Sequence, residues 1–211
     1  MREHAVTAAL TVSFQRYPYP PSGWVETLPR SRGALPLAAA GPGRLLLPVP
    51  AGEAVWVGLV ATPGGPSSLV AVAAELGSGE RVDLATGPVP PRFAVEGIAR
   101  GDGGWWALAR EAPAPAAPAC AALELLVWTG PPADTGPGER GPRPQHDPTG
   151  PTGPGGPGGP SPPAPVASSP AGPPATLRVE LVDPARFEAA GGEPLGAPAG
   201  DEATYRGWPL P

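Results

Sequence analysis

Apolar and polar side chains alternate with a period of two along much of this chain, which is the pattern of strands with one buried face. Over residues 6–14 the even positions are apolar, whereas threonine and serine fill most odd positions. Successive side chains of a strand point to opposite faces of its sheet. We therefore predict a strand across residues 6–15, with its even positions in the core. The proline-rich segment 16–24 that follows is expected to interrupt regular structure.

Further strands are predicted between turns that are rich in glycine and proline. They fall at residues 45–49, 54–61, 69–76, 80–85, 92–100, 105–109 and 119–129. The turns at 77–79 and 101–104 have hairpin composition, so each is expected to join the strands beside it. Residues 54–61 are apolar on both faces, which predicts a central strand that is covered on both sides.

The alternation returns near the end of the sequence, at residues 177–182. Asp183 followed by Pro184 favours a short helix to about residue 190, because aspartate caps a helix and proline suits its first turn. A single strand needs a sheet to bury its apolar face. We therefore expect this strand to pair with the body of the chain. The alternative is that it extends a sheet of a neighbouring subunit.

Residues 131–175 interrupt the strand pattern. More than half of them are proline or glycine, and Val166 is the only large aliphatic residue. Ordering a backbone costs about 1–2 kcal/mol per residue, and this stretch has little apolar area to offset that cost. It is predicted to be a disordered loop or linker. The chain then divides into a body at 1–130, this linker, and a C-terminal strand and tail at 176–211 that complete the body.

Taken together, these elements predict an all-β fold. About eight or nine short strands separated by regular turn signals are typical of an antiparallel β-sandwich or an open barrel. The long proline- and glycine-rich loop and the C-terminal strand with its short helical turn complete the expected architecture.

Composition narrows the classes of partner. The chain contains neither lysine nor asparagine, a bias that we attribute to a GC-rich, bacterial coding sequence. Its formal net charge is −5 and its pI is about 5.0, so a nucleic-acid partner is not expected. No apolar stretch suits a signal peptide or a membrane span. The sequence therefore predicts a cytoplasmic protein without membrane contact.

Residues for catalysis or metal binding are sparse. The two histidines are His4, near the N-terminus, and His146, within the linker, so neither a catalytic triad nor a metal site is expected. The single cysteine, Cys120, lies in an apolar run and is interpreted as a buried structural thiol. Glu124 lies in the same run and is expected to pair with an arginine. No cofactor is predicted, because the glycine-rich turns join strands and lack the helix that a phosphate site requires.

Aromatic residues are the one suggestive feature, since the chain has six tryptophans. Trp56 and Trp128 lie in apolar strands and are predicted to be in the core. The remaining aromatic residues outside the core strands form a candidate interaction surface, because aromatic and arginine side chains are typical of binding hot spots. This surface consists of Tyr17, Tyr19, Trp24, Trp105, Trp106, Tyr205 and Trp208.

Three functions remain open at this stage. The leading hypothesis is a non-enzymatic β-sandwich that binds a protein partner or itself, as a structural or accessory subunit of a bacterial assembly. The second is a module that binds a small ligand or a carbohydrate. The third is an enzyme whose carboxylates, such as Glu96 and Glu124, converge only in the fold.

Overall fold

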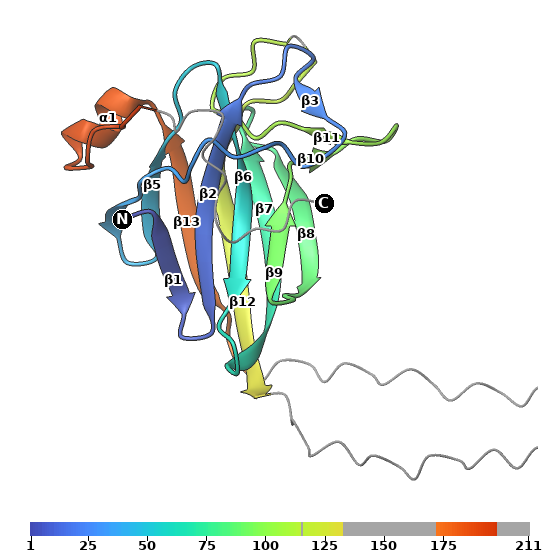
Figure 1. The fold of residues 1–211 in the computed structure, drawn as a ribbon, viewed down its shortest axis with the longest axis vertical. Helices are drawn as coiled ribbons and strands as arrows, with labels where there is room; N and C mark the ends of the chain where they lie inside the picture. The colour runs from blue at the N-terminus through green and yellow to red at the C-terminus, as the bar shows by residue number, and fades with distance from the viewer. Residues whose placement is uncertain (115, 133–171, 198–211) are drawn as a thin grey trace, which may run out of the picture. The chain divides into compact units, whose positions relative to one another are not determined.

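Two β-sheets face each other across an aliphatic core in the computed structural model (Figure 1). The structure describes residues 1–114, 116–132 and 172–197, and only the backbone of Pro131 and Pro132. The described parts are almost entirely strands and turns, with one short helix. All strand pairs but one are antiparallel. The predicted all-β class is therefore confirmed.

The first sheet has four strands, in the order β1-β2-β6-β9. Their bounds are Glu3–Thr7 for β1, Leu10–Pro18 for β2, Glu53–Ala61 for β6 and Arg92–Val95 for β9. The expectation of a single strand over 6–15 is wrong, because a turn at Ala8 and Ala9 divides it into the β1–β2 hairpin. The expected break at Arg16 is also wrong, since β2 continues along β6 as far as Pro18.

The second sheet has six strands, in the order β4-β5-β13-β12-β7-β8. Their bounds are Ala38–Gly41 for β4, Arg44–Pro48 for β5, Pro66–Leu76 for β7, Arg81–Pro88 for β8, Cys120–Pro132 for β12 and Ala175–Val182 for β13. The C-terminal strand β13 lies inside this sheet. It runs parallel to β5 on one side and antiparallel to β12 on the other.

The core lies between the two sheets and takes alternate residues from each of them. From the first sheet it receives Leu10, Val12 and Phe14 of β2 together with alternate residues of β6. The second sheet contributes alternate residues of β7, β12 and β13. A bulge between Cys120 and Ala122 shifts the alternation of β12. As a result the Cys120 side chain joins the core, and it is 1% exposed.

Strand β6 is buried on both faces, as its sequence predicts. Val55, Val57 and Leu59 face the main core, whereas Ala54 and Trp56 belong to a second apolar cluster with Tyr17. This second cluster lies beneath a small third sheet, to which Val25 belongs.

The third sheet has three strands of two residues each, in the order β10-β11-β3. They are β3 at Trp24–Val25, β10 at Ile98–Ala99 and β11 at Trp105–Trp106. The hairpin expected from residues 92–100 and 105–109 is much shorter than predicted, because the first half of its leading strand, β9, pairs with β6 instead. The third sheet lies at one end of the sandwich (Figure 1).

A single short helix, α1, follows β13 at Pro184–Ala189. The Asp183 side chain accepts a hydrogen bond of 2.8 Å from the backbone N–H of Arg186, so it caps the helix as expected. Phe187 is buried with Leu46 and Val182 on the outer face of the second sheet. The helix therefore covers one corner of that face.

Charged side chains occupy part of the outer face of the second sheet, across β13, β12, β7 and β8. Glu124 pairs with Arg81, as the sequence suggested, and Arg178 pairs with Glu75 at 2.7 Å. The expectation that Trp128 is in the core is wrong. Trp128 lies on this outer face, one strand position from buried Val127, and is half-buried.

The remaining structural expectations concern the linker and membrane contact. Strands β12 and β13 extend to Pro132 and from Ala175, so both ends of the predicted linker belong to strands. The expected disorder of residues 133–171 concerns residues outside the described parts. The helix of the described chain is too short and polar to cross a membrane.

Candidate functional site

An arginine stacked against two tryptophans forms the most distinctive feature of the third sheet. Trp106 of β11 is paired with Trp24 of β3, which places both indoles on one face of the sheet. The guanidinium carbon of Arg100 lies 4.0 Å from the ring centroid of Trp24 and 4.8 Å from that of Trp106. These are cation–π distances. We refer to Trp24, Arg100 and Trp106 as the indole–arginine cluster.

The cluster is half open to solvent. Both tryptophans are half-buried, and the Arg100 side chain is 14% exposed. Arg100 also pairs with Asp102, but its Nη1 has no acceptor among the described residues. Arg100, Gly101 and Asp102 therefore belong to a turn whose arginine stacks on the indoles.

Two glycines allow the backbones around the cluster to approach each other. Gly104 has a φ of +72°, and a Cβ at this position would lie 2.5 Å from the carbonyl oxygen of Val25. A Cβ on Gly97 would lie 2.2 Å from the carbonyl oxygen of Trp106. Only glycine fits such close contacts without displacing the backbone. These two residues fix the position of β11 between its neighbours.

The other aromatic residues of the candidate surface lie in different surroundings. Trp105 is half-buried opposite Val25. Tyr17 is only 2% exposed and belongs to the second apolar cluster, and Tyr19 packs at the edge of that cluster. Burial raises the pKa of Tyr17 and of Tyr19 above the ordinary value. Tyr205 and Trp208 lie outside the described residues.

A groove of about 330 Å³ adjoins this end of the sandwich. We call it the proline groove, because prolines form much of its lining. Its lining residues are Tyr17, Pro18, Pro20, Val25, Pro29, Arg30, Ser31 and Arg32. The buried hydroxyl of Tyr17 has no hydrogen-bond partner among the described residues. Val25 of β3 lines the groove, whereas Trp24, the preceding residue, belongs to the indole–arginine cluster on the other face of the third sheet.

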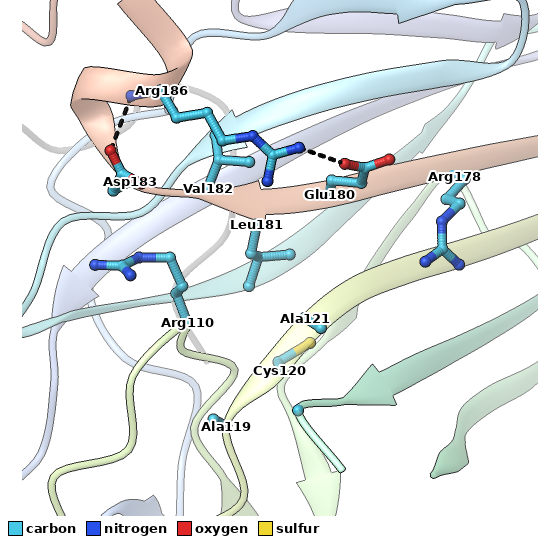
Figure 2. A pocket seen from close by; sticks show the side chains of 11 residues that line it. Arg110, Ala119, Cys120, Ala121, Arg178, Glu180, Leu181, Val182, Asp183 and Arg186 are labelled. Atoms are coloured by element: carbon cyan, nitrogen blue, oxygen red, sulfur yellow. Dashed lines mark hydrogen bonds and ion pairs between the residues drawn. The ribbon is translucent and has the colours of Figure 1, made fainter. Parts of the chain in front are cut away.

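A second cleft, of about 390 Å³, lies where β12 begins and β13 meets α1. Figure 2 shows Arg110, Arg178 and Arg186 around it, with Glu180 and Asp183 between them. We call it the arginine cleft. Each of its arginines is already paired with a carboxylate: Arg178 with Glu75 at 2.7 Å, Arg186 with Glu180 at 3.2 Å, and Arg110 with Glu111. Its positive charge is thus neutralised locally.

The thiol near the arginine cleft is held in its protonated form, and the neighbouring acids are paired with arginines. Burial raises the pKa of the Cys120 thiol to about 12, and a nucleophilic cysteine requires the opposite shift. The neighbouring guanidinium of Arg178 lowers the pKa of Glu75. Arg44 has the same effect on Glu180. These carboxylates act as partners in ion pairs.

The two carboxylates considered for an enzymatic site are not brought together. Glu124 is on the outer face of the second sheet with Arg81, whereas Glu96 follows β9 of the first sheet. Partial burial raises the pKa of Glu96. Within the described parts of the chain, no three His, Cys, Asp or Glu side chains gather as metal ligands.

Sequence reasoning found the tryptophans of the cluster but missed Arg100 and the proline groove. From the sequence, Arg100 is the last residue of the strand predicted over residues 92–100 and has no role of its own. Its spacing of two from Ile98 becomes informative only once the strand register is known, because Ile98 pairs with Trp106 and both then lie on the indole face. The groove has no such signal, because its two loops meet only in the fold.

Comparison of this chain with known protein families, curated proteins and solved structures finds no relative. No protein-family model matches the chain, and neither a curated protein nor a solved structure is detectably similar to it. The chemistry of the site therefore stands on the residues described above.

Proposed function

We propose that this protein is a non-enzymatic β-sandwich module that binds a protein partner, or a second copy of itself, through the indole–arginine cluster. On this proposal it serves as an accessory or structural subunit of a cytoplasmic bacterial assembly. The observation that supports it best is the half-open stack of Arg100 on Trp24 and Trp106. Tryptophan and arginine are the residue types most enriched among binding hot spots.

The geometry of the cluster favours a protein interface for two reasons. Its side chains are held in place by a short sheet and by glycines that admit no other residue, so little conformational freedom is lost on binding. In addition, Nη1 of Arg100 still lacks an acceptor among the described residues. This nitrogen is buried in the free protein, so a carbonyl or carboxylate of a partner would reach it only if the guanidinium turned outward on binding.

The same geometry disfavours the carbohydrate-binding alternative. A sugar stacks on the open face of an aromatic ring, and here Arg100 occupies one face of both indoles. A titration with a panel of oligosaccharides, followed by tryptophan fluorescence and thermal melting, distinguishes the two hypotheses. A saturable change with any sugar would favour the carbohydrate-binding function.

The proposal is tested by the size of the complex that the full-length protein forms in its native lysate and after purification. Trp106→Ala is expected to shift the protein from the complex to the monomer, because truncating a hot-spot tryptophan costs about 2 kcal/mol or more of binding free energy. Size-exclusion chromatography with light scattering measures the shift. A wild-type protein that is monomeric in both settings contradicts the proposal.

Trp128→Ala is the matched control. Trp128 is also a half-buried tryptophan on a strand, but it lies on the outer face of the second sheet. This variant is expected to keep the complex. Equal loss in both variants would show that general destabilisation, and not the indole–arginine cluster, governs the assembly.

A further inference from the structure

Strand β8 is the open edge of the six-stranded sheet. It pairs with β7 on one side, and no strand of the described chain pairs with its other side. Residues 84–87 at its centre read LATG and carry no charge. Proteins that remain monomeric usually protect such an edge with charged side chains or cover it, because its free N–H and C=O groups can pair with a further strand. The free edge of β8 is therefore a surface on which another strand can bind.

The backbone groups that face the open edge can be identified from the β7–β8 ladder. The amide of Leu76 donates to the carbonyl of Glu80 at 2.8 Å, and the amide of Val89 donates to the carbonyl of Ser68 at 2.9 Å. In an antiparallel pair, residues bonded in this way alternate with residues whose N–H and C=O groups point away from the partner strand. Counted from both ends, with the register shift within β8 taken into account, the outward N–H groups belong to three exposed residues: Arg81, Asp83 and Thr86.

The core-facing side chains of β8 are also incompletely covered. Val82 and Leu84 pack against the main core but remain half-buried. The core residues beside them on β7, Val72 and Ala74, are 1% and 0% exposed. The difference arises because β7 has a neighbouring strand on both sides, whereas β8 has one on a single side. A further strand along β8 would extend over Val82 and Leu84 and bury more of their apolar area.

A second copy of β8 itself has the pattern that this edge requires. Two identical strands that pair antiparallel are related by a two-fold axis, so each contact is formed twice. With Asp83 opposite Thr86 of the second copy, the whole of β8 is paired and each threonine hydroxyl can donate to a carboxylate. With Asp83 opposite Asp83 of the second copy, two like charges would face each other, which is unfavourable. The register with Asp83 opposite Thr86 is therefore favoured.

The same arrangement brings the two ends of β8 together. Strand β8 runs in the same direction as β12, because both are antiparallel to β7. It therefore begins at the end of the sandwich that carries the third sheet (Figure 1), and strand β10 of that sheet lies against it. Antiparallel pairing thus places the indole–arginine cluster of one copy next to the end of β8, and the turn at residues 88–91, of the other copy.

The turn at residues 88–91 suits the indole–arginine cluster in shape and charge. It reads PVPP, and its three prolines are exposed. Aromatic side chains are the usual binding surface for exposed prolines. Arg92 follows the turn, is exposed, and forms no ion pair with any described residue. Asp102 lies beside the cluster with a side chain that is 67% exposed, so a pair of Arg92 with Asp102 of the other copy would be formed twice.

We infer that β8 pairs with β8 of a second copy of this chain, with Asp83 opposite Thr86. The two six-stranded sheets then form one continuous sheet, and the indole–arginine cluster of each copy binds the turn at residues 88–91 of the other. This inference rests on the proposed function, because it identifies a second copy as the partner of that cluster.

Proline substitution at the free edge tests the inference. Thr86→Pro removes an outward N–H that the β7 ladder does not use, so the variant is expected to fold, and circular dichroism and thermal melting check this. Light scattering of the purified protein over a concentration series measures the dimer dissociation constant, which is expected to rise about tenfold or more. Thr86→Ala, the matched control, should change the constant by about threefold or less.

The outcomes separate this inference from the proposed function. Loss of the complex in Trp106→Ala, together with an unchanged dimer in folded Thr86→Pro, would overturn the pairing of β8 and leave the proposed function in place. A purified wild type that is monomeric at every concentration, but joins a complex in its native lysate, would have the same meaning. A wild type that is monomeric in both settings contradicts both proposals.

Amide hydrogen exchange provides a test that depends on no variant. In the wild type, the amides of Asp83 and Thr86 are expected to exchange about tenfold or more slowly at concentrations where the protein is dimeric than where it is monomeric. The amides of Val82 and Gly87, which face β7, should exchange slowly in both conditions. Exchange at Asp83 and Thr86 that does not depend on concentration would overturn the inference.

Charge reversal tests which ends of the two copies meet. Arg92→Glu and Asp102→Arg are each expected to raise the dissociation constant about threefold to tenfold, and combining them should restore it. Glu188→Arg, at an exposed position of α1, is the control and should leave the constant unchanged. Two single variants without effect, or no recovery in the combination, would contradict the placement of the cluster on the turn at residues 88–91.

Discussion

Neighbouring residues of one strand contribute very different amounts to the free energy of folding of this protein. Leu123 of β12 is completely buried between the sheets, whereas Glu124 faces outward and pairs with half-exposed Arg81. Truncating a buried leucine costs about 2–5 kcal/mol, but an exposed ion pair contributes about 1 kcal/mol or less. The side chains that hold the fold together are therefore the aliphatic ones. The carboxylates of the second sheet contribute to its solubility and register.

Cys120 is the residue whose burial has a direct consequence for pH dependence. Its thiol pKa is raised from 9.0 to about 12 in the folded chain. Between these two values the folded state keeps a proton that the unfolded state has lost. The stabilising contribution of the thiol is therefore complete below pH 9 and decreases as the pH rises, by about 1.4 kcal/mol per unit.

We predict that the free energy of unfolding of the wild type falls by about 2 kcal/mol more than that of Cys120→Ala between pH 8.5 and pH 10.5. Urea unfolding at a series of pH values measures both proteins. Tyr17 titrates in both, so the difference isolates the thiol. Parallel curves for the two proteins would show that Cys120 is not buried as described.

At the scale of elements, the hairpin between β10 and β11 determines the geometry of the indole–arginine cluster. Gly104 is the critical residue of its turn, because it combines a positive φ with a contact to the Val25 carbonyl. Gly101 belongs to the same turn but has open space around its Cα. The two glycines therefore provide a matched pair of sites.

Gly104→Ala is expected to displace β11 from β3 and to destabilise the protein by about 1–3 kcal/mol. It should also alter the tryptophan fluorescence and the near-ultraviolet circular dichroism of the cluster. Gly101→Ala should leave both spectra and the melting temperature nearly unchanged. Identical behaviour of the two variants would argue against the close approach at Gly104.

The elements also show what the sequence can and cannot reveal. Period-two alternation identified β7, β8, β12 and β13 well, because each has one face in the core. It failed at the β1–β2 turn, where Ala8 and Ala9 continue the apolar pattern without any typical turn residue. It also failed for Trp128. The outward positions of β12 near Trp128 are apolar, so the sequence resembles that of a strand buried on both faces, although one face of this sheet is exposed.

The candidate site was predictable only in part, for a similar reason. The tryptophans of β3 and β11 stand out by composition, whereas the partner of their rings, Arg100, depends on the register between three strands. The proline groove depends on two loops that come together across the second apolar cluster. Local patterns carry no information on such tertiary contacts.

At the scale of the whole molecule, strand β13 joins the described residues after position 171 to those before position 133. It pairs with β5 on one side and β12 on the other, and Leu177, Val179 and Leu181 lie in the main core. Removing a strand from such a position would open the sheet and expose the core. Residues 172–197 are therefore an integral part of the same sandwich that carries the indole–arginine cluster.

Cleavage of the chain between β12 and β13 tests this claim most directly. A specific protease site is placed over residues 153–159, and the cleaved protein is analysed by size-exclusion chromatography under native conditions and in concentrated guanidinium chloride. We predict that the two fragments elute together under native conditions, with an unchanged near-ultraviolet spectrum, and separate only in the denaturant. Native separation, with the larger fragment still folded, would contradict the account.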